Sequence, residues 1–508
     1  MPRKTGQLLI FVHGWSVTST ATYGQLPARL KHEAQKRGGP PLDVRHIYLG
    51  EYVSFHDTIR VEDIARAFDG ALGDVLAQYG KGRRCVCITH STGGPVVREW
   101  LDRYIVQAGK LGQCPISHLL MLAPANFGSA LAQLGKSRIG AIKAWFNGIE
   151  PGQHVLDWLE LGSPAACALN LRWIRDYPVL KLTQGTHPVF PFVLTGDAID
   201  RKLYDHLNPY TGEIGSDGVM RVAAANLNAT HVVLRQPSTQ RGEPLPRARK
   251  RLRTLELEST RRAMPTAFKI VPGKSHSGDA MGIMASVRDD DTPDATVTAI
   301  LACLKVRDAA GYTALRKTFE AENAAHQAVG NRLETEHVPV LPDRQYIHDP
   351  CSMVIFRLFD SASWRVSDVD ILLTAGPADS PDQLPRGFMI DRQADRQQPA
   401  NITFYLNHAV LAGCPPIPDP DGGIARVALE PRPPYGVQIH PRHDHRFVEY
   451  WRTMLDSSMQ DLLPLIRPNE TTLVDIHLTR VVHENVFRFT TQLAPPVDFK
   501  DVKPGGVA

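Results

Sequence analysis

The chain has 508 residues, of which 43% are hydrophobic and 22% are charged, and its formal net charge at pH 7 is +4. A chain of this length exceeds one compact core and is expected to form about two to four globular domains. The small positive charge does not indicate nucleic-acid binding, and the sequence has no apolar run of about 18 residues that would predict a membrane-spanning helix.

Short apolar segments alternate with amphipathic segments through the N-terminal part of the chain. The expected strands are residues 7–12, 44–50, 84–90, 117–123, 188–197 and 267–271. The expected helices are residues 21–38, 60–80, 95–109 and 292–306. Strands that alternate with helices predict a mostly parallel sheet covered by helices on both faces.

One serine lies at the junction of an expected strand and an expected helix, in "CVCITHSTGGPVVREW", residues 85–100. A tight turn there would expose the serine hydroxyl at the end of the sheet, and its crowding requires small residues two positions before and after Ser91. Gly93 meets this requirement, whereas Thr89 is bulkier than the glycine expected there. The free N–H groups at the start of the next helix would face a reacting oxygen, so Thr92 is expected to supply one oxyanion donor. The backbone N–H of Trp15, after "LLIFVHG", is expected to supply the second.

The segments "FVHGW", "ITHSTGG" and "LAPANFGS" occur in this order within residues 7–130. Together they resemble the α/β-hydrolase superfamily in its lipase-like branch, and the resemblance extends more weakly to about residue 305. It implies a triad in the order serine, acid, histidine. "GSDGVM" selects Asp217 as the acid, with Asp197 in "LTGD" as the reserve, although an Asp-Gly pair also forms ordinary turns. His276, in the loop after the last expected strand, is the expected base.

The resemblance implies a serine-dependent carboxylic ester hydrolase, a lipase or phospholipase, that works through an acyl-enzyme without a metal or cofactor. His276 would take the Ser91 proton, and Asp217 would stabilise the imidazolium. His13 and His90 are expected to be structural, with His90 as an alternative pocket-wall residue. Two other functions stay open: an inactive scaffold on the same fold, which Thr89 favours, and acyl transfer to an acceptor other than water.

A helical cap is expected over about residues 127–185, because the strand pattern stops there and large apolar residues appear. As a cap it would provide an acyl-binding wall; as ordinary core helices it would have no contact with substrate. The candidate wall residues are Trp145, Phe146, Trp158 and Leu159.

The domain organisation predicted from these patterns is an α/β-hydrolase domain over residues 1–306, a linker helix over 307–335 and a β-rich domain over 336–508. Short β-type runs divided by Pro, Gly and Asp indicate an antiparallel, sandwich-like fold for the last part, interrupted by one helix at 445–466. Its partner is not identified by the sequence. It could bind a lipid surface or another protein, buttress the hydrolase, or form a dimer.

Other features bear on partners and location. The basic stretch "RARKRLR", residues 247–253, predicts either a solvated loop or a peripheral contact with anionic lipid headgroups. "DPDGG", residues 419–423, indicates a turn in preference to a calcium loop. Cys85 and Cys87 are expected to be core thiols on one strand face. The N-terminus lacks the form of a signal peptide, which predicts a cytoplasmic protein or export by a signal-independent route.

Overall fold

The computed structural model describes most of the chain, in fourteen segments. They are residues 6–13, 20–47, 58–80, 82–134, 152–200, 213–239, 243–328, 333–336, 344–414, 417–418, 424–426, 432–442, 448–458 and 460–482. Trp15, Trp145, Phe146 and the expected turn at 419–423 lie outside these segments.

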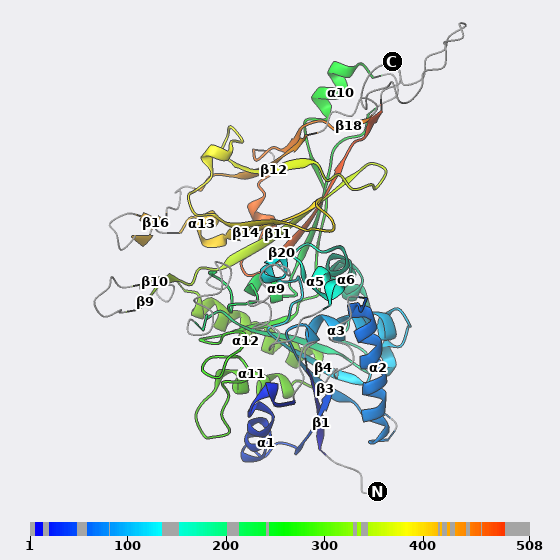
Figure 1. Ribbon diagram of the computed structural model, residues 1–508, viewed down its shortest axis with the longest axis vertical. Helices are drawn as coiled ribbons and strands as arrows, with labels where there is room; N and C mark the ends of the chain where they lie inside the picture. Colours follow the sequence, from blue (N-terminus) through cyan, green and yellow to red (C-terminus); the bar gives the residue numbers. More distant parts are fainter. Residues whose placement is uncertain are drawn as a thin grey trace.

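A parallel six-stranded sheet forms the core of the N-terminal part (Figure 1). Its strand order is β2-β1-β3-β4-β5-β8, and all neighbouring pairs are parallel. The strands are β1 (Gln7–Val12), β2 (Leu42–Ile47), β3 (Cys85–His90), β4 (Ile116–Leu122), β5 (Phe190–Gly196) and β8 (Ala267–Val271). This sheet confirms the predicted α/β-hydrolase class.

Helices cover both faces of this sheet. Successive strand residues point to opposite faces, so each face carries apolar side chains that the helices bury. In β1, Leu8 and Ile10 belong to one core cluster and Leu9 and Phe11 to another. The first cluster contains residues of α2 (Val61–Ala77) and α3 (Gly93–Trp100), which continues into the π-helical turn η2 (Leu101–Val106). The second contains residues of α1 (Leu26–Lys36), α11 (Ala295–Leu304) and α12 (Ala309–His326). Cys85 and Cys87 share the first cluster as free buried thiols, as expected.

The C-terminal part is a β-sandwich. One sheet has the order β13-β14-β11-β20-β6-β7, and the other has β12-β17-β19. Side chains from both sheets form one hydrophobic cluster, which confirms the sandwich-like arrangement. The strands are β11 (Cys351–Asp360), β12 (Val369–Ala375), β13 (Met389–Ala394), β14 (Asn401–Asn407), β17 (Tyr435–Pro441), β19 (Thr453–Leu455), β20 (Thr471–Leu478), β6 (Thr230–Arg235) and β7 (Glu256–Arg262).

Two strands depart from the expected division at residue 306. β6 and β7 come from the N-terminal part of the chain, yet they complete the larger sandwich sheet, with β6 parallel to β20. The sandwich is therefore mixed and not purely antiparallel, because β11 also runs parallel to β20. The chain crosses from the first sheet to the second after β5 and returns for β8.

The central strands of the larger sandwich sheet are buried on both faces. In β11, Val354, Phe356 and Leu358 face the smaller sheet. Met353 and Ile355 share the core cluster of the N-terminal part. Burial of such side chains stabilises the fold by about 1.5–3 kcal/mol each. The two parts therefore share a continuous apolar interface.

Part of the expected cap, around α6 (Pro164–Arg175), lies in this interface (Figure 1). The described helices of the cap are α5 (Gln153–Leu159), α6 and α7 (Tyr177–Leu180). Leu161, Cys167 and Leu171 share a core cluster with the inner face of β11. The Asn401 side chain also donates a 2.6 Å hydrogen bond to the Gly162 carbonyl.

The structure overturns one expected helix and places another. Residues 445–466 were predicted to be helical, but the described residues there form β18 (Val448–Glu449), β19 and the 3-10 turn η9 (Leu463–Leu465). Residues of β19 instead form hydrogen bonds with β17. This pairing with a distant strand could not be predicted from the local, helix-like spacing of the apolar residues. The expected linker helix is α12, which packs on the first sheet: the Tyr312 hydroxyl donates to the Pro191 carbonyl at 2.6 Å.

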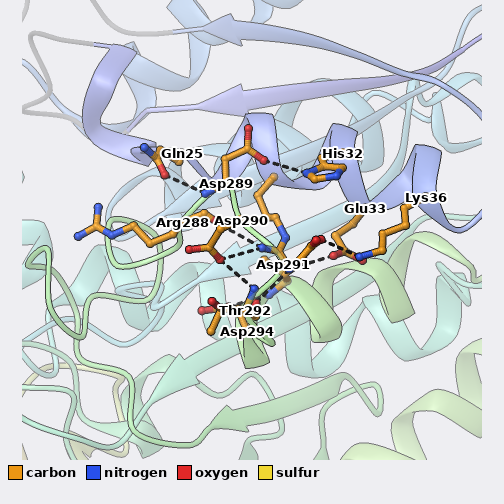
Figure 2. Close-up of polar contacts among 12 residues, drawn as sticks. Gln25, His32, Glu33, Lys36, Arg288, Asp289, Asp290, Asp291, Thr292 and Asp294 are labelled. Carbon is orange, nitrogen blue, oxygen red and sulfur yellow. Dashed lines mark hydrogen bonds and ion pairs between the residues drawn. The ribbon is translucent and has the colours of Figure 1, made fainter.

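A charged cluster ties α1 to the loop that precedes α11 (Figure 2). The buried Arg29 guanidinium lies 2.9 Å from a Glu33 oxygen and 3.3 Å from Asp290, and it donates to the Thr292 carbonyl at 3.0 Å. Lys36 pairs with Asp291 at 2.7 Å. These contacts hold the chain between the His276 loop and α11 against α1.

The remaining described elements are short. They are η1 (Thr20–Tyr23), η3 (Leu111–Gln113), η4 (Ala130–Leu134), α9 (Val222–Ala225), α10 (Leu245–Arg251), β9 (Leu333–Glu336), β10 (Arg344–Ile347), η8 (Pro381–Gln383), α13 (His408–Ala412), β15 (Ile417–Pro418), β16 (Ile424–Arg426) and β21 (Val481–Val482). Among the helices that the structure describes, none combines the length and apolar character needed to cross a bilayer.

Candidate active site

Ser91 occupies a sharp turn between β3 and α3. Its φ is 52°, in the left-handed region that is uncommon for residues other than glycine. The Ser91 N–H donates to the Leu122 carbonyl at 3.0 Å, and the Gly94 N–H donates back to the Ser91 carbonyl at 3.1 Å. This backbone is typical of the nucleophile turn of α/β-hydrolases, in which strain accompanies exposure of the hydroxyl at the carboxyl end of the sheet.

The turn is crowded on the side of the next strand. A Cβ at Gly94 would lie 2.7 Å from the Pro124 Cβ, too close for any larger residue without a shift. Thr89, the departure noted in the sequence, is fully buried in β3, and its hydroxyl makes no hydrogen bond to any described residue. The bulkier Thr89 is therefore accommodated inside the sheet.

Three side chains predicted from separate loops lie in one hydrogen-bonded chain. The His276 Nε2 lies 3.2 Å from the Ser91 Oγ, and its Nδ1 lies 3.0 Å from the Asp217 Oδ2. All three residues are buried, with Ser91 8% exposed and Asp217 fully enclosed. In this arrangement His276 can take the hydroxyl proton while Asp217 holds the ring and stabilises its charge.

The loop that carries Asp217 is tightly bonded. Its Oδ1 accepts the N–H groups of Val219 at 3.0 Å and Met220 at 2.6 Å, which leaves Oδ2 for His276. A backbone bond from the His276 N–H to the Asp217 carbonyl, 2.9 Å long, joins the two loops directly. The carboxylate is therefore oriented by its own turn as well as by the histidine.

His90 lies against His276, which its sequence position did not predict. The two ring centroids are 4.7 Å apart, and the His90 Nε2 lies 3.2 Å from the His276 carbonyl oxygen. Burial lowers the pKa of His90 well below its ordinary value, and the adjacent charge of His276 lowers it further. A neutral His90 can pack on the base without repelling the imidazolium that forms there.

One of the two expected oxyanion donors falls within the described residues. Thr92 directly follows Ser91 at the cap of α3, where helical N–H groups and the helix dipole favour negative charge. Trp15 lies outside them. His13, two residues earlier, is buried, and its Nε2 lies 3.0 Å from the His46 Nδ1. Burial lowers the pKa of His13 to about 4, and the charge of His46 contributes to this shift.

The two described acyl-wall candidates are core residues. Trp158 and Leu159 are 4% and 1% exposed and belong to a cluster built from α2, α3, α5, α6 and the loop after Asp217. Val219 and Met220 of that loop are members of the same cluster. Their packing matches the core alternative, and an acyl-binding role for them stays a prediction.

Asp197, the reserve acid, pairs with a different histidine. Its Oδ2 lies 2.7 Å from the Nε2 of His326, near the end of α12, and the pair ties that helix to the loop after β5. The hydrogen bond to Asp197 raises the pKa of His326. Asp197 is thus engaged in a contact between elements and not with His276.

The His326 pair predicts a pH-dependent contribution to stability. Because the folded-state pKa is raised, the contribution is complete below the ordinary histidine pKa of about 6.5 and is lost as pH rises through the folded value. His326→Gln should lower the Tm by about 1–2 °C at about pH 5.5, and the difference should vanish at about pH 9. Differential scanning calorimetry across this range measures it; a difference that grows with pH would contradict the assignment.

The chain is similar to a phospholipase of known structure over nearly its whole length. The phospholipase PlaB from Legionella pneumophila is 42% identical, with 97% of each chain covered and a TM-score of 0.81. The same phospholipase in complex with thio-NAD is 38% identical, again with 97% of each chain covered and a TM-score of 0.79.

The mature form of a lipase from Bacillus licheniformis is 16% identical. The match covers 44% of this chain and 80% of the lipase, with a TM-score of 0.30. No protein-family model and no curated protein matches the chain.

Proposed function

Since this chain belongs to the family of the Legionella phospholipase PlaB and is a carboxylic ester hydrolase of the lipase and phospholipase class, we propose that it cleaves acyl esters of phospholipids with Ser91, His276 and Asp217 as its triad. The observation that supports this assignment most directly is the continuous hydrogen-bonded chain from the Ser91 hydroxyl to the Asp217 carboxylate. Its order along the sequence is that of α/β-hydrolases.

The proposed reaction has two half-reactions. His276 removes the proton from the Ser91 Oγ as this oxygen attacks the ester carbonyl, and it then passes the proton to the departing alcohol. His276 then takes a proton from water, which attacks the acyl-enzyme, and passes it to the Ser91 Oγ as the fatty acid leaves, which restores the free hydroxyl. The N–H at Thr92 would stabilise the oxyanion in both steps, and Asp217 stabilises the imidazolium.

The substrate class is tested by comparing lipids under matched conditions. We expect fatty-acid release from phosphatidylcholine and phosphatidylglycerol in mixed micelles at rates at least about tenfold above triacylglycerol in the same detergent, because a phospholipid-selective site gains transition-state binding from the headgroup. Free fatty acid measured by mass spectrometry gives each rate. Equal or faster triacylglycerol cleavage would place the enzyme among lipases, and complete inertness would favour the scaffold alternative.

We further propose that the basic tip of the β6–β7 arm contacts anionic membrane surfaces. The tip is formed by α10, which lies beside β18 at the end of the molecule far from the N-terminus (Figure 1). The Arg249 guanidinium lies 5.1 Å from the centre of the Trp451 ring. Around it is a cavity of about 370 Å³ lined by Arg249, Arg253, Pro441, Arg442, Glu449, Tyr450, Trp451 and Arg452. Four arginines, of which Arg442 also pairs with Asp370, line it with one glutamate and two half-buried aromatic rings, a lining that suits phosphate headgroups.

Charge reversal tests the membrane contact. The double variant Arg249→Glu with Arg253→Glu should bind vesicles of phosphatidylglycerol at least about thirtyfold more weakly, since each basic residue near such a surface contributes about 1 kcal/mol. Hydrolysis of a short soluble ester should be unchanged. The matched control reverses Arg66 and Lys110, two exposed cations on the N-terminal part, and should bind as wild type does. Equal losses in both double variants, measured by vesicle co-sedimentation, would contradict a specific tip.

A further inference from the structure

The loop that carries Asp217 rests on the sandwich and not only on its own domain. We define the acid loop as residues 213–221. Arg221, at its end, is 2% exposed, and its guanidinium forms two 2.7 Å bonds with the Glu213 carboxylate, at the start of the loop. The same guanidinium pairs with Asp391 on β13. Both ends of the acid loop are thereby joined to each other and to the sandwich.

A tyrosine of the sandwich also supports the acid loop. The ring of Tyr405, on β14, lies under the Arg221 guanidinium with its centre 4.1 Å from Cζ. Its hydroxyl lies 2.9 Å from the carbonyl oxygens of both Ile214 and Gly215, which share its single proton. Tyr405 is fully buried. One side chain therefore supports the loop from below and binds its backbone.

Tyr405 and Cys351 pack against the acid loop so closely that the loop cannot move toward the sandwich. Gly215 has a φ of +65°, and a Cβ there would lie 2.6 Å from the Tyr405 hydroxyl and 2.9 Å from the Cys351 sulfur. The Gly215 carbonyl also accepts the Val222 N–H at 2.9 Å, which closes the loop around Asp217. A shift at Gly215 is thus transmitted to Asp217 through a closed ring of backbone bonds.

We propose that Tyr405, Asp391 and Arg221 are positioning residues for the catalytic acid, so that the sandwich forms part of the catalytic apparatus. This inference rests on the proposed function, because it requires Asp217 to serve His276. The physical basis is that the carboxylate stabilises the imidazolium only at hydrogen-bonding distance, and a misplacement of about 1 Å can lower a rate by about a hundredfold. Removal of one supporting side chain should therefore lower kcat less than removal of the acid itself.

The test compares two buried tyrosines that each lose only a hydroxyl. Tyr405→Phe keeps the ring under Arg221 and removes the bonds to the acid loop. Tyr435→Phe is the matched control, because its hydroxyl donates a 3.0 Å bond to the Leu411 carbonyl entirely within the sandwich. The full-length chain is used for both, and the number of competent sites is first counted by labelling with a fluorophosphonate, which reacts with activated serines.

We expect Tyr405→Phe to lower kcat per labelled site about tenfold with little change in KM, since the lost hydrogen bond supports the loop that carries Asp217 and not the substrate. The acidic limb of its kcat/KM profile should move to lower pH, because the imidazolium is less well stabilised. Tyr435→Phe should keep the wild-type kcat per site and pH profile, with a comparable loss in Tm.

The outcomes separate this inference from the proposed function. If both tyrosine variants keep the wild-type kcat per labelled site and pH profile, the positioning role is refuted while the triad stands. If both lose kcat in proportion to Tm, the effect is one of general stability and the positioning role is again refuted. If the wild-type protein itself is neither labelled nor active, the proposed function fails first.

Discussion

Replacement of Ser91 by alanine is expected to remove essentially all ester hydrolysis. The alanine keeps the Cβ and so preserves the left-handed turn at φ 52°, but it leaves no oxygen to attack the substrate. Loss of a triad serine lowers kcat by about 10⁴–10⁶-fold, and the residual rate comes from the oxyanion donors and binding. Initial rates on p-nitrophenyl butyrate and on phosphatidylglycerol micelles measure this effect.

The control for Ser91→Ala is its thermal stability, which shows whether the fold is kept. Its Tm should stay within about 2 °C of wild type, because the Ser91 hydroxyl bonds only to His276 among the described residues and its loss opens no cavity in the sheet. Wild-type activity in the variant would assign the nucleophile to another residue. A large Tm loss would make the activity loss uninformative, and the adduct measurement described below would then decide the assignment.

Replacement of Asp217 by asparagine is expected to lower kcat by about 10⁴-fold. Asparagine can still accept the Val219 and Met220 N–H groups through Oδ1, so the loop is retained. Its amide NH2 then faces the His276 Nδ1, where a carboxylate oxygen stood. His276 must carry its proton on Nε2, and it can no longer take the proton of Ser91.

Asp197→Asn is the matched control for this second prediction. Both aspartates lie in the part of the chain after β5, are buried and contact a histidine, but Asp197 contacts His326. Its replacement should leave kcat within about threefold of wild type and lower only the Tm, by the small amount expected for an ion pair with one partly exposed partner. Steady-state kinetics on the purified variants distinguish the two. A larger kcat loss in Asp197→Asn would transfer the acid role to the reserve residue.

The first sheet was predictable because its central strands β1, β3, β4 and β5 are buried on both faces. Such strands appear as continuous apolar runs, and "QLLIFV" and "CVCITH" need no partner to be recognised. The order of the loops then follows from the fold, which is why candidates for nucleophile, acid and base could be proposed before their distances were known. Sequence order alone could not choose between Asp197 and Asp217. The structure separates them through His326.

The second sheet was less predictable, for reasons of sequence separation. β6 pairs with β20, about 240 residues away, and no local pattern encodes the register of such a pair. β7, "ELESTRR", lies on the exposed edge and has no apolar face to reveal it. Tyr405 and Arg221 escaped notice for the same reason: each is an ordinary residue alone and acquires meaning only where the sandwich meets the acid loop.

The most direct test of the central claim, that Ser91 is the nucleophile, is identification of the covalent adduct. The wild-type chain is treated with a fluorophosphonate, digested and analysed by tandem mass spectrometry. We expect a single phosphonylated residue, Ser91, in stoichiometric yield, with labelling slowed by phospholipid substrate and abolished in Ser91→Ala and His276→Ala. An adduct at a different serine, or a fully active enzyme that carries none at Ser91, would contradict the account.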